Sequence, residues 1–178
     1  NSNTITKLKN LLTNSNTLES LGYEITIGKC VWNQNKSLLT DNKDKTKLIY
    51  SSNIKNNSII DLIKTRDTDQ KKQYINLEGI NDNTPLLLLN RGHGSGKYQF
   101  NYCIFQPNNK PYLLENHIIS IKDTSSNNNK EKILNYKKII NSFNNDKTKE
   151  FINLFIGNGG INTSEIKKLI PIYGFSST

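Results

Sequence analysis

A run of four leucines that leads into a glycine-rich loop constrains the fold of this chain more than any other stretch. The leucines occupy residues 86–89, and glycines recur at residues 92–96. A short apolar run bounded by glycines predicts a buried β-strand. Aromatic and polar side chains then alternate over residues 98–105, which predicts a half-buried strand. We therefore expect two neighbouring strands of one sheet, joined by a glycine loop.

The glycine loop carries two cations and an imidazole on a backbone with few side chains. Arg91, His93, Ser95 and Lys97 are its polar residues. Such a loop suits close approach of the main chain to a large anion. It does not match a phosphate-binding P-loop, which needs glycine where Arg91 stands and Ser or Thr where Tyr98 stands. A hairpin turn without a ligand remains the alternative.

Composition favours a polyanionic partner without deciding the question. The chain has 178 residues and a formal net charge of +9, and a basic surface attracts nucleic acid. Lysine and asparagine codons are rich in A and T, so genome composition is an equal explanation for the charge. The only cysteines, Cys30 and Cys103, are too few for a disulfide scaffold, and no apolar stretch approaches the length of a membrane span. We expect a cytoplasmic, monomeric protein that does not contact a membrane.

The order of the predicted elements indicates an α+β fold. Helical spacing covers residues 4–21, and strands are predicted at 23–32, 48–50 and 112–121 in addition to the central pair. Helical spacing returns over 133–143 and 151–156, and a third helix follows an N-cap at Asn162. Strands followed by helices predict a mainly antiparallel, curved sheet with C-terminal helices on one face or end. We expect one domain over 1–178, with a strand-rich part at 22–122 and a helical part at 130–173.

Polar side chains recur where the predicted strands end. Reading of DNA bases needs amides and guanidinium groups on loops, with lysines nearby for phosphates. The candidate DNA contacts are Lys29, Trp32, Asn33, Gln34, Lys36, Ser52, Asn53, Arg91, His93, Ser95, Lys97, Asn116 and His117. Each has an ordinary alternative, such as Trp32 in the core, Asn53 in a turn or Asn116 in a bulge. Trp32, Asn33, Gln34 and Lys36 follow a strand directly, so we expect them to project from its end.

Arg91 is one of only two arginines in a chain rich in lysine. This choice indicates a partner that prefers a planar, bidentate donor. The partner is either DNA or a structural carboxylate such as Glu115. No spacing of cysteine and histidine predicts a metal site, and no nucleophile elbow is present. A small-molecule enzyme that uses His93 and Lys97 remains a further alternative, since it would need only a pocket around the loop.

Several motifs together resemble a known family. The chain is similar to the C-terminal target-recognition domain of TaqI/Eco57I-like adenine-N6 DNA methyltransferases. The resemblance runs from about Leu18 to Tyr173 and rests on short segments in the same order, at residues 28–36, 48–54, 88–92, 115–117, 155–158 and 169–173. It implies a domain that clamps double-stranded DNA and reads the recognition sequence of a restriction–modification system.

The resemblance also implies what this chain lacks. The family's N-terminal domain binds S-adenosylmethionine and carries an Asn/Asp-Pro-Pro-Tyr/Phe motif, whereas the four prolines here are never adjacent. We therefore expect no cofactor and no catalytic residue in this sequence, and a partner catalytic domain upstream in the same chain. The alternative is a non-enzymatic specificity subunit that assembles with separate methylase subunits.

Overall fold

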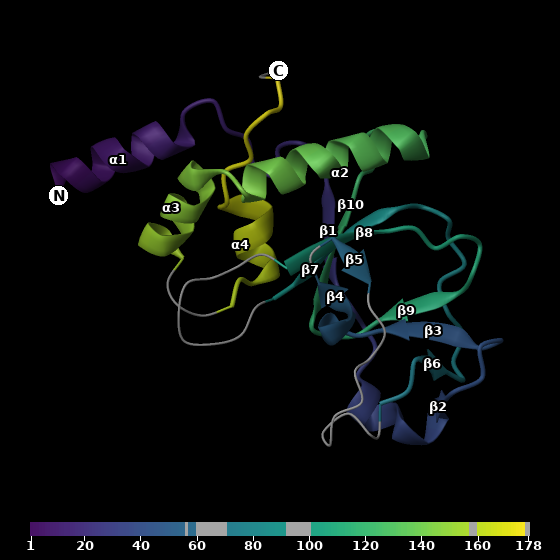
Figure 1. Ribbon diagram of the computed structural model, residues 1–178. Helices are drawn as coiled ribbons and strands as arrows, with labels where there is room; N and C mark the ends of the chain where they lie inside the picture. The colour runs from purple at the N-terminus through teal and green to yellow at the C-terminus, as the bar shows by residue number, and fades with distance from the viewer. Residues whose placement is uncertain (56, 60–70, 92–100, 157–159, 177–178) are drawn as a thin grey trace. The chain divides into compact units, whose positions relative to one another are not determined.

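A computed structural model describes residues 1–55, 57–59, 71–91, 101–156 and 160–176 of the chain (Figure 1). Its elements form an α+β fold with mainly antiparallel sheets that do not close into barrels, so the predicted fold class is confirmed at this level. His93, Ser95 and Lys97 of the glycine loop lie outside the described residues. Within the described ranges, no helix is both long enough and apolar enough to cross a membrane.

The chain divides into two compact units. The helical unit comprises Asn1–Ile25, Arg91–Phe100 and Lys122–Thr178, and the strand unit comprises Thr26–Asn90 and Asn101–Ile121. The N-terminal segment and Arg91 belong to the same unit as the C-terminal helices. Each unit is described by itself below.

The helical unit contains α1 (Ser2–Leu12), α2 (Asn129–Phe143), α3 (Asp146–Phe155) and α4 (Thr163–Lys168) (Figure 1). An asparagine caps the N-terminus of each of these helices: Asn1, Asn128, Asn145 and Asn162 accept hydrogen bonds from backbone amides of the first turn. Asparagine is among the best N-cap residues. The cap predicted at Asn162 is confirmed, and Glu165 completes a capping box with it. Part of the asparagine excess therefore has a structural use.

Buried aromatic and aliphatic side chains hold the helical unit together. Tyr136 and Phe143 of α2 are almost fully buried, as is Ile166 of α4. The helix predicted over 4–21 ends earlier, at Leu12, because Thr13 is extended and Asn14 has a φ of 58°. A left-handed residue cannot continue a right-handed helix.

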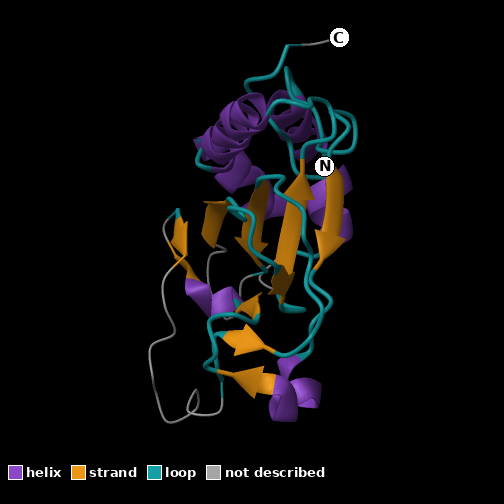
Figure 2. Cartoon of the chain, turned by 90° about the vertical axis from the view of Figure 1, so that its right-hand side faces the viewer, coloured by secondary structure: helices purple, strands orange, loops and turns teal. Residues whose placement is uncertain are grey.

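The strand unit contains most of a sheet with the order β1-β10-β7-β8 (Figure 2). Its strands are β1 (Glu24–Ile27), β10 (Ile118–Lys122), β7 (Leu86–Asn90) and β8 (Asn101–Phe105), and the outer ends of β1 and β10 fall at the unit boundary. β7 pairs antiparallel with β8, so the predicted neighbours are confirmed. The leucines of β7 are buried on both faces of the sheet, which explains their unbroken run.

A second sheet of the strand unit has the order β2-β6-β3-β9. It comprises β2 (Leu39–Thr40), β6 (Tyr74–Ile75), β3 (Thr46–Ile49) and β9 (Tyr112–Leu114). β3 pairs antiparallel with β6 and parallel with β9. A small hairpin of β4 (Ile54–Lys55) and β5 (Ser58–Ile59) completes the described strands.

The single strand predicted over 112–121 is wrong, since it is two strands in two sheets. β9 belongs to the second sheet, β10 belongs to the first, and residues 115–117 connect them. The predicted strand 23–32 is also too long: β1 ends at Ile27, and a 3₁₀ helix, η1 (Trp32–Leu38), follows after one isolated bridge at Cys30. Both differences have one cause, which is the hydrogen bonding of these two segments to each other.

Candidate nucleic-acid interface

Three segments of the strand unit meet at Glu115. The Gly28 amide donates to the Ile118 carbonyl at 2.8 Å, and the Cys30 amide donates to the Leu114 carbonyl at 3.0 Å. The Glu115 amide in turn donates to the Ile49 carbonyl at 2.9 Å. These bonds bring together the ends of β1, β3 and β9, which lie far apart in sequence.

The side-chain carboxylate of Glu115 contacts two of these segments. Glu115 is only 3% exposed. Its Oε1 lies 2.6 Å from Nδ1 of His117, and its Oε2 accepts a hydrogen bond of 2.9 Å from the Ser51 amide. A buried carboxylate is tolerated only when it is paired or hydrogen-bonded. The two contacts satisfy both oxygens, and they fix the His117 ring and the turn that follows β3.

The turn after β3 is a 3₁₀ helix, η2 (Ser51–Asn53), whose last residue bonds back to the residue before the helix. Asn53 is 3% exposed, and its Oδ1 accepts a 2.8 Å hydrogen bond from the Tyr50 amide. This is the turn role that the sequence left open as the alternative to DNA contact. The side-chain amide of Asn90, at the end of β7, donates to the Ser51 carbonyl at 3.3 Å. Residues 29–36, 50–53, 90 and 115–117 therefore belong to one arrangement, together with Lys71, whose ammonium group lies over the Trp32 ring, and we call it the Glu115 cluster.

Glycine is required at position 28, where the backbone that follows β1 passes close to the Glu115 backbone. A Cβ atom at Gly28 would lie 1.9 Å from the Glu115 carbonyl oxygen. Real Cβ atoms do not approach backbone that closely, so any other residue would push the two segments apart. The first glycine of the 28–36 motif therefore has a steric reason that is independent of any ligand.

Two ionisable groups beside Glu115 are held in their neutral forms. Burial raises the pKa of the Cys30 thiol, and the charge of Glu115 raises it further. Burial also raises the pKa of the Tyr50 hydroxyl, which donates a hydrogen bond to the Lys72 carbonyl, and the nearby Glu115 raises this pKa further. A thiol with a raised pKa is a poor nucleophile. Cys30 therefore packs as an apolar residue.

Trp32 begins η1 and carries the aromatic part of the cluster. Its ring meets the buried Tyr50 ring edge-on, with centroids 6.4 Å apart. The ammonium groups of Lys36 and Lys71 lie 5.4 Å and 5.1 Å from the Trp32 ring centre, within the range of cation–π attraction. Trp32 is partly buried against the core that contains Leu48. One side of its ring therefore has the core position that the sequence left open as the alternative to DNA contact. The lysines hold positive charge beside the same ring.

Exposure separates the predicted contacts into three groups. Lys29, Asn33, Gln34, Lys36 and Ser52 are exposed, Trp32, Asn116 and His117 are partly buried, and Asn53 is buried. Asn33, Gln34 and Lys36 of η1 are thus exposed, whereas Trp32 packs partly against the core, and a short bridge at Cys30 separates all of them from β1. Arg91 is partly exposed and belongs to the helical unit, where its carbonyl accepts a hydrogen bond from the Ile161 amide.

Asn116 contains a buried oxygen that the described structure leaves unpaired. Its amide nitrogen in the backbone donates to the Cys30 carbonyl at 3.0 Å. Its side-chain Oδ1 is buried and has no hydrogen-bond partner among the described residues. Leaving such an atom unpaired costs about 1–3 kcal/mol. A donor from a ligand or from water would remove this cost.

Sequence reasoning missed Lys71 and did not place Glu115 at the centre of the cluster. Glu115 was considered as part of the 115–117 motif and as a partner for Arg91, and Tyr50 as part of the 50–53 segment that ends a strand. The proximity of Glu115 to His117 was the available signal, because a carboxylate two residues from an imidazole suggests a pair. Lys71 gave no signal, since its approach to Trp32 depends on the fold. No group of three metal-ligating side chains occurs in the part of the chain that the structure describes.

Comparison with known proteins adds no assignment. No model of a protein family matches the chain, and no curated protein matches it significantly.

Proposed function

We propose that this chain is the target-recognition domain of an adenine-N6 DNA methyltransferase similar to the TaqI/Eco57I-like enzymes. In this role it binds double-stranded DNA and reads a base sequence, while a catalytic domain elsewhere in the enzyme binds S-adenosylmethionine and transfers the methyl group. The observation that carries the proposal is the Glu115 cluster, because the buried carboxylate holds His117 and the Ser51 amide, and the segment that carries the exposed amides and lysines of η1 is bonded at Cys30 to the backbone on either side of Glu115.

Rigid placement is what base reading requires of such side chains. A base pair presents a fixed pattern of donors and acceptors, so the protein groups that read it need fixed positions. Glu115 supplies this rigidity through its bonds to His117 and to the Ser51 amide. Gln34 and Asn33 lie exposed on η1 in the same cluster. Their amides have the paired donor and acceptor that suit an adenine edge.

The lysines of the cluster have a different role. Lys29 and Lys36 are exposed, and Lys36 and Lys71 flank Trp32. An ammonium group on a flexible stem is a point charge, which contacts phosphates regardless of sequence. We therefore assign affinity to the lysines and sequence preference to the amides.

His117 has its orientation set by Glu115. The neutral ring donates its Nδ1 proton to the carboxylate at 2.6 Å, which leaves Nε2 as the acceptor.

Selection from a library of randomised duplexes tests the proposal. The 178-residue chain is incubated with the library at low salt, and bound duplexes are amplified and sequenced over several rounds. We expect enrichment of one short motif that contains adenine. Enrichment of no motif, or equal retention of DNA and a neutral polymer, would contradict the proposal.

Two substitutions then distinguish recognition of bases from charge-driven contact with phosphates. Gln34→Ala should weaken binding to the selected site by about 1–3 kcal/mol and leave binding to random DNA unchanged. Lys36→Ala should weaken binding to both and lower the salt slope by about one. Equal loss on both duplexes for Gln34→Ala would remove Gln34 as a reader.

The methyltransferase part of the proposal has its own test. The motif that the chain selects should carry N6-methyladenine in the genome of the cell that encodes it, which sequencing of native DNA detects. If all copies of the motif are unmethylated, the methyltransferase part of the proposal is contradicted, while the DNA-recognition part stands.

A further inference from the structure

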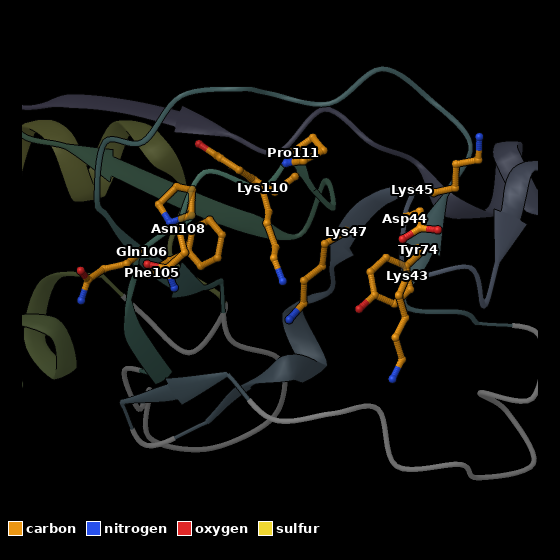
Figure 3. Close-up of a pocket in the computed structure, with 12 residues that line it drawn as sticks. Lys43, Asp44, Lys45, Lys47, Tyr74, Phe105, Gln106, Asn108, Lys110 and Pro111 are labelled. Carbon is orange, nitrogen blue, oxygen red and sulfur yellow. The ribbon is translucent and has the colours of Figure 1, made fainter.

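A basic pocket in the strand unit lies apart from the residues assigned to base reading. Its volume is about 570 Å³, within the range of small-molecule sites. Four lysines line it, Lys43, Lys45, Lys47 and Lys110, together with Tyr74 and Tyr112. Figure 3 shows the ends of Lys47 and Lys110 directed toward the same space, with Tyr74 beside them. We call this site the lysine pocket.

The sheet fixes the centre of the pocket. Lys47 on β3 is paired in register with Tyr74 on one side and with Tyr112 on the other. Residues in register on neighbouring strands share a face of the sheet, so the three side chains form a row. Tyr112 packs edge-on against Phe105, with ring centroids 4.9 Å apart. One lysine is thereby placed between two tyrosines above an aromatic wall.

Turns hold the remaining lysines. The Lys45 amide donates to the Asn42 carbonyl at 3.2 Å, in the turn between β2 and β3 that also contains Lys43. The Lys110 amide donates to the Pro107 carbonyl at 3.2 Å, in the turn before β9. Their backbones are therefore positioned by local hydrogen bonds, while their ammonium ends can move.

The charge of the pocket is unbalanced. Asp44 is the single carboxylate among its lining residues. Among the described residues, no ion pair involves any of the four lysines. Like charges held together repel one another, and an anion that carries more than one negative charge relieves this repulsion. Lysine is well suited to phosphate, which it contacts as a compact point charge.

The aromatic residues of the pocket restrict the class of ligand further. Tyr74 is partly exposed, so its ring can contact a flat apolar group while its hydroxyl offers a hydrogen bond. A phosphate beside an aromatic surface is the combination that nucleotides require. We propose that the lysine pocket binds a phosphorylated nucleotide, with the phosphate between Lys47 and Lys110 and the base against Tyr74. The nucleotide is either a free molecule or one unit of a single strand.

Calorimetric titration of the 178-residue chain at low salt tests this site. The probes are AMP, ATP, pyrophosphate, adenosine and a six-nucleotide single strand of thymidylate. AMP and ATP should bind at least about tenfold more tightly than adenosine, because adenosine lacks the charged hydrogen bonds. Tighter binding of ATP than of the single strand would identify a free nucleotide as the ligand, and the reverse order would identify a strand.

Substitutions locate the binding. Lys47→Gln and Lys110→Gln should each weaken nucleotide binding by about tenfold, whereas Lys137→Gln, at an exposed position of α2, should leave it unchanged. Tyr74→Leu should weaken AMP and leave pyrophosphate unchanged. Circular dichroism and the melting temperature establish that each variant is folded.

The inference is overturned if no probe binds, if adenosine binds as well as AMP, or if Lys47→Gln and Lys110→Gln bind like the parent chain. Retention of sequence preference on duplex DNA in these variants would confine that failure to the lysine pocket. The proposed recognition function would stand, since it depends on the Glu115 cluster.

Discussion

The Glu115 cluster and the lysine pocket are two polar regions of the strand unit that differ in how their side chains are held. In the cluster, a carboxylate that is 3% exposed binds His117 and the Ser51 amide. In the pocket, the ammonium groups of Lys43, Lys45 and Lys110 extend from exposed turns. Buried hydrogen bonds fix a geometry, whereas exposed charges supply attraction over a range of geometries. The contrast supports the proposal that the cluster provides specificity and the pocket provides charge-driven binding.

The largest expected effect is a failure of the cluster when Gly28 is replaced. Gly28→Ala places a Cβ atom where the Glu115 carbonyl oxygen now lies, at a separation of 1.9 Å. We expect the free energy of unfolding to fall by about 3 kcal/mol in urea titration, because backbone must move on both sides. Gly174→Ala is the control: a Cβ atom there meets no atom within 4 Å, and its φ of 92° makes the cost about 1 kcal/mol. Equal losses for the two variants would show that the close approach is not required.

Removal of the charge of Glu115 should have the next largest effect. Glu115→Gln keeps the size of the side chain but replaces a carboxylate acceptor of His117 and Ser51 with an amide. We expect a loss of about 2 kcal/mol in the free energy of unfolding, the usual range for a hydrogen bond to a charged group. Glu78→Gln, at an exposed site, should change stability by less than about 0.5 kcal/mol. A Glu115→Gln variant as stable as its parent would mean that the carboxylate is not what organises the cluster.

The pocket should respond to alkaline pH through Tyr112. Burial, with a smaller contribution from Asp82, raises the pKa of Tyr112 to about 12. Since the folded pKa exceeds the unfolded value of about 10, the protonated hydroxyl stabilises the fold below pH 10, and this contribution is lost as the pH rises toward 12. The loss between pH 9 and pH 11 should be about 1 kcal/mol.

Chemical unfolding at both pH values, with Tyr112→Phe, measures this contribution. The variant should lose about 1 kcal/mol less than the parent chain over this interval. Identical pH profiles for the parent and Tyr112→Phe would contradict the assignment of this loss to Tyr112.

The smallest expected effect concerns a lysine at the rim of the pocket. Lys45→Gln removes one of several like charges, so it should stabilise the fold slightly at low salt, by less than about 0.5 kcal/mol. The gain should disappear in 1 M salt, where charges are screened over about 3 Å. A clear loss of stability at low salt would reveal an ion pair of Lys45 and would weaken the contrast between the two regions.

Local patterns in the sequence determined part of the secondary structure and part of the topology. The leucine run and the alternation after it predicted β7 and β8 as neighbours, and their antiparallel register confirms this. The Asn162 cap with Glu165 three residues later is likewise found as a capping box. These features depend on residues close in sequence, or on strands joined by one connection, so the pattern contains the information needed to predict them.

Only the tertiary structure decided that one predicted strand is two and that Glu115 stands where they meet. Three polar residues, Glu115, Asn116 and His117, interrupt the apolar stretch from Tyr112 to Ile121, and such an interruption fits a bulge in one strand as well as a change of sheet. That change is set by the close passage of Gly28 over the Glu115 backbone and by the bond from the Glu115 amide to the Ile49 carbonyl. Such contacts join residues dozens of positions apart, and a one-dimensional pattern of polarity does not encode which distant backbones approach. For the same reason, nothing in the sequence indicated Lys71, which only the fold brings to Trp32. Gln34 differs, because its position after a predicted strand had already indicated that it is exposed.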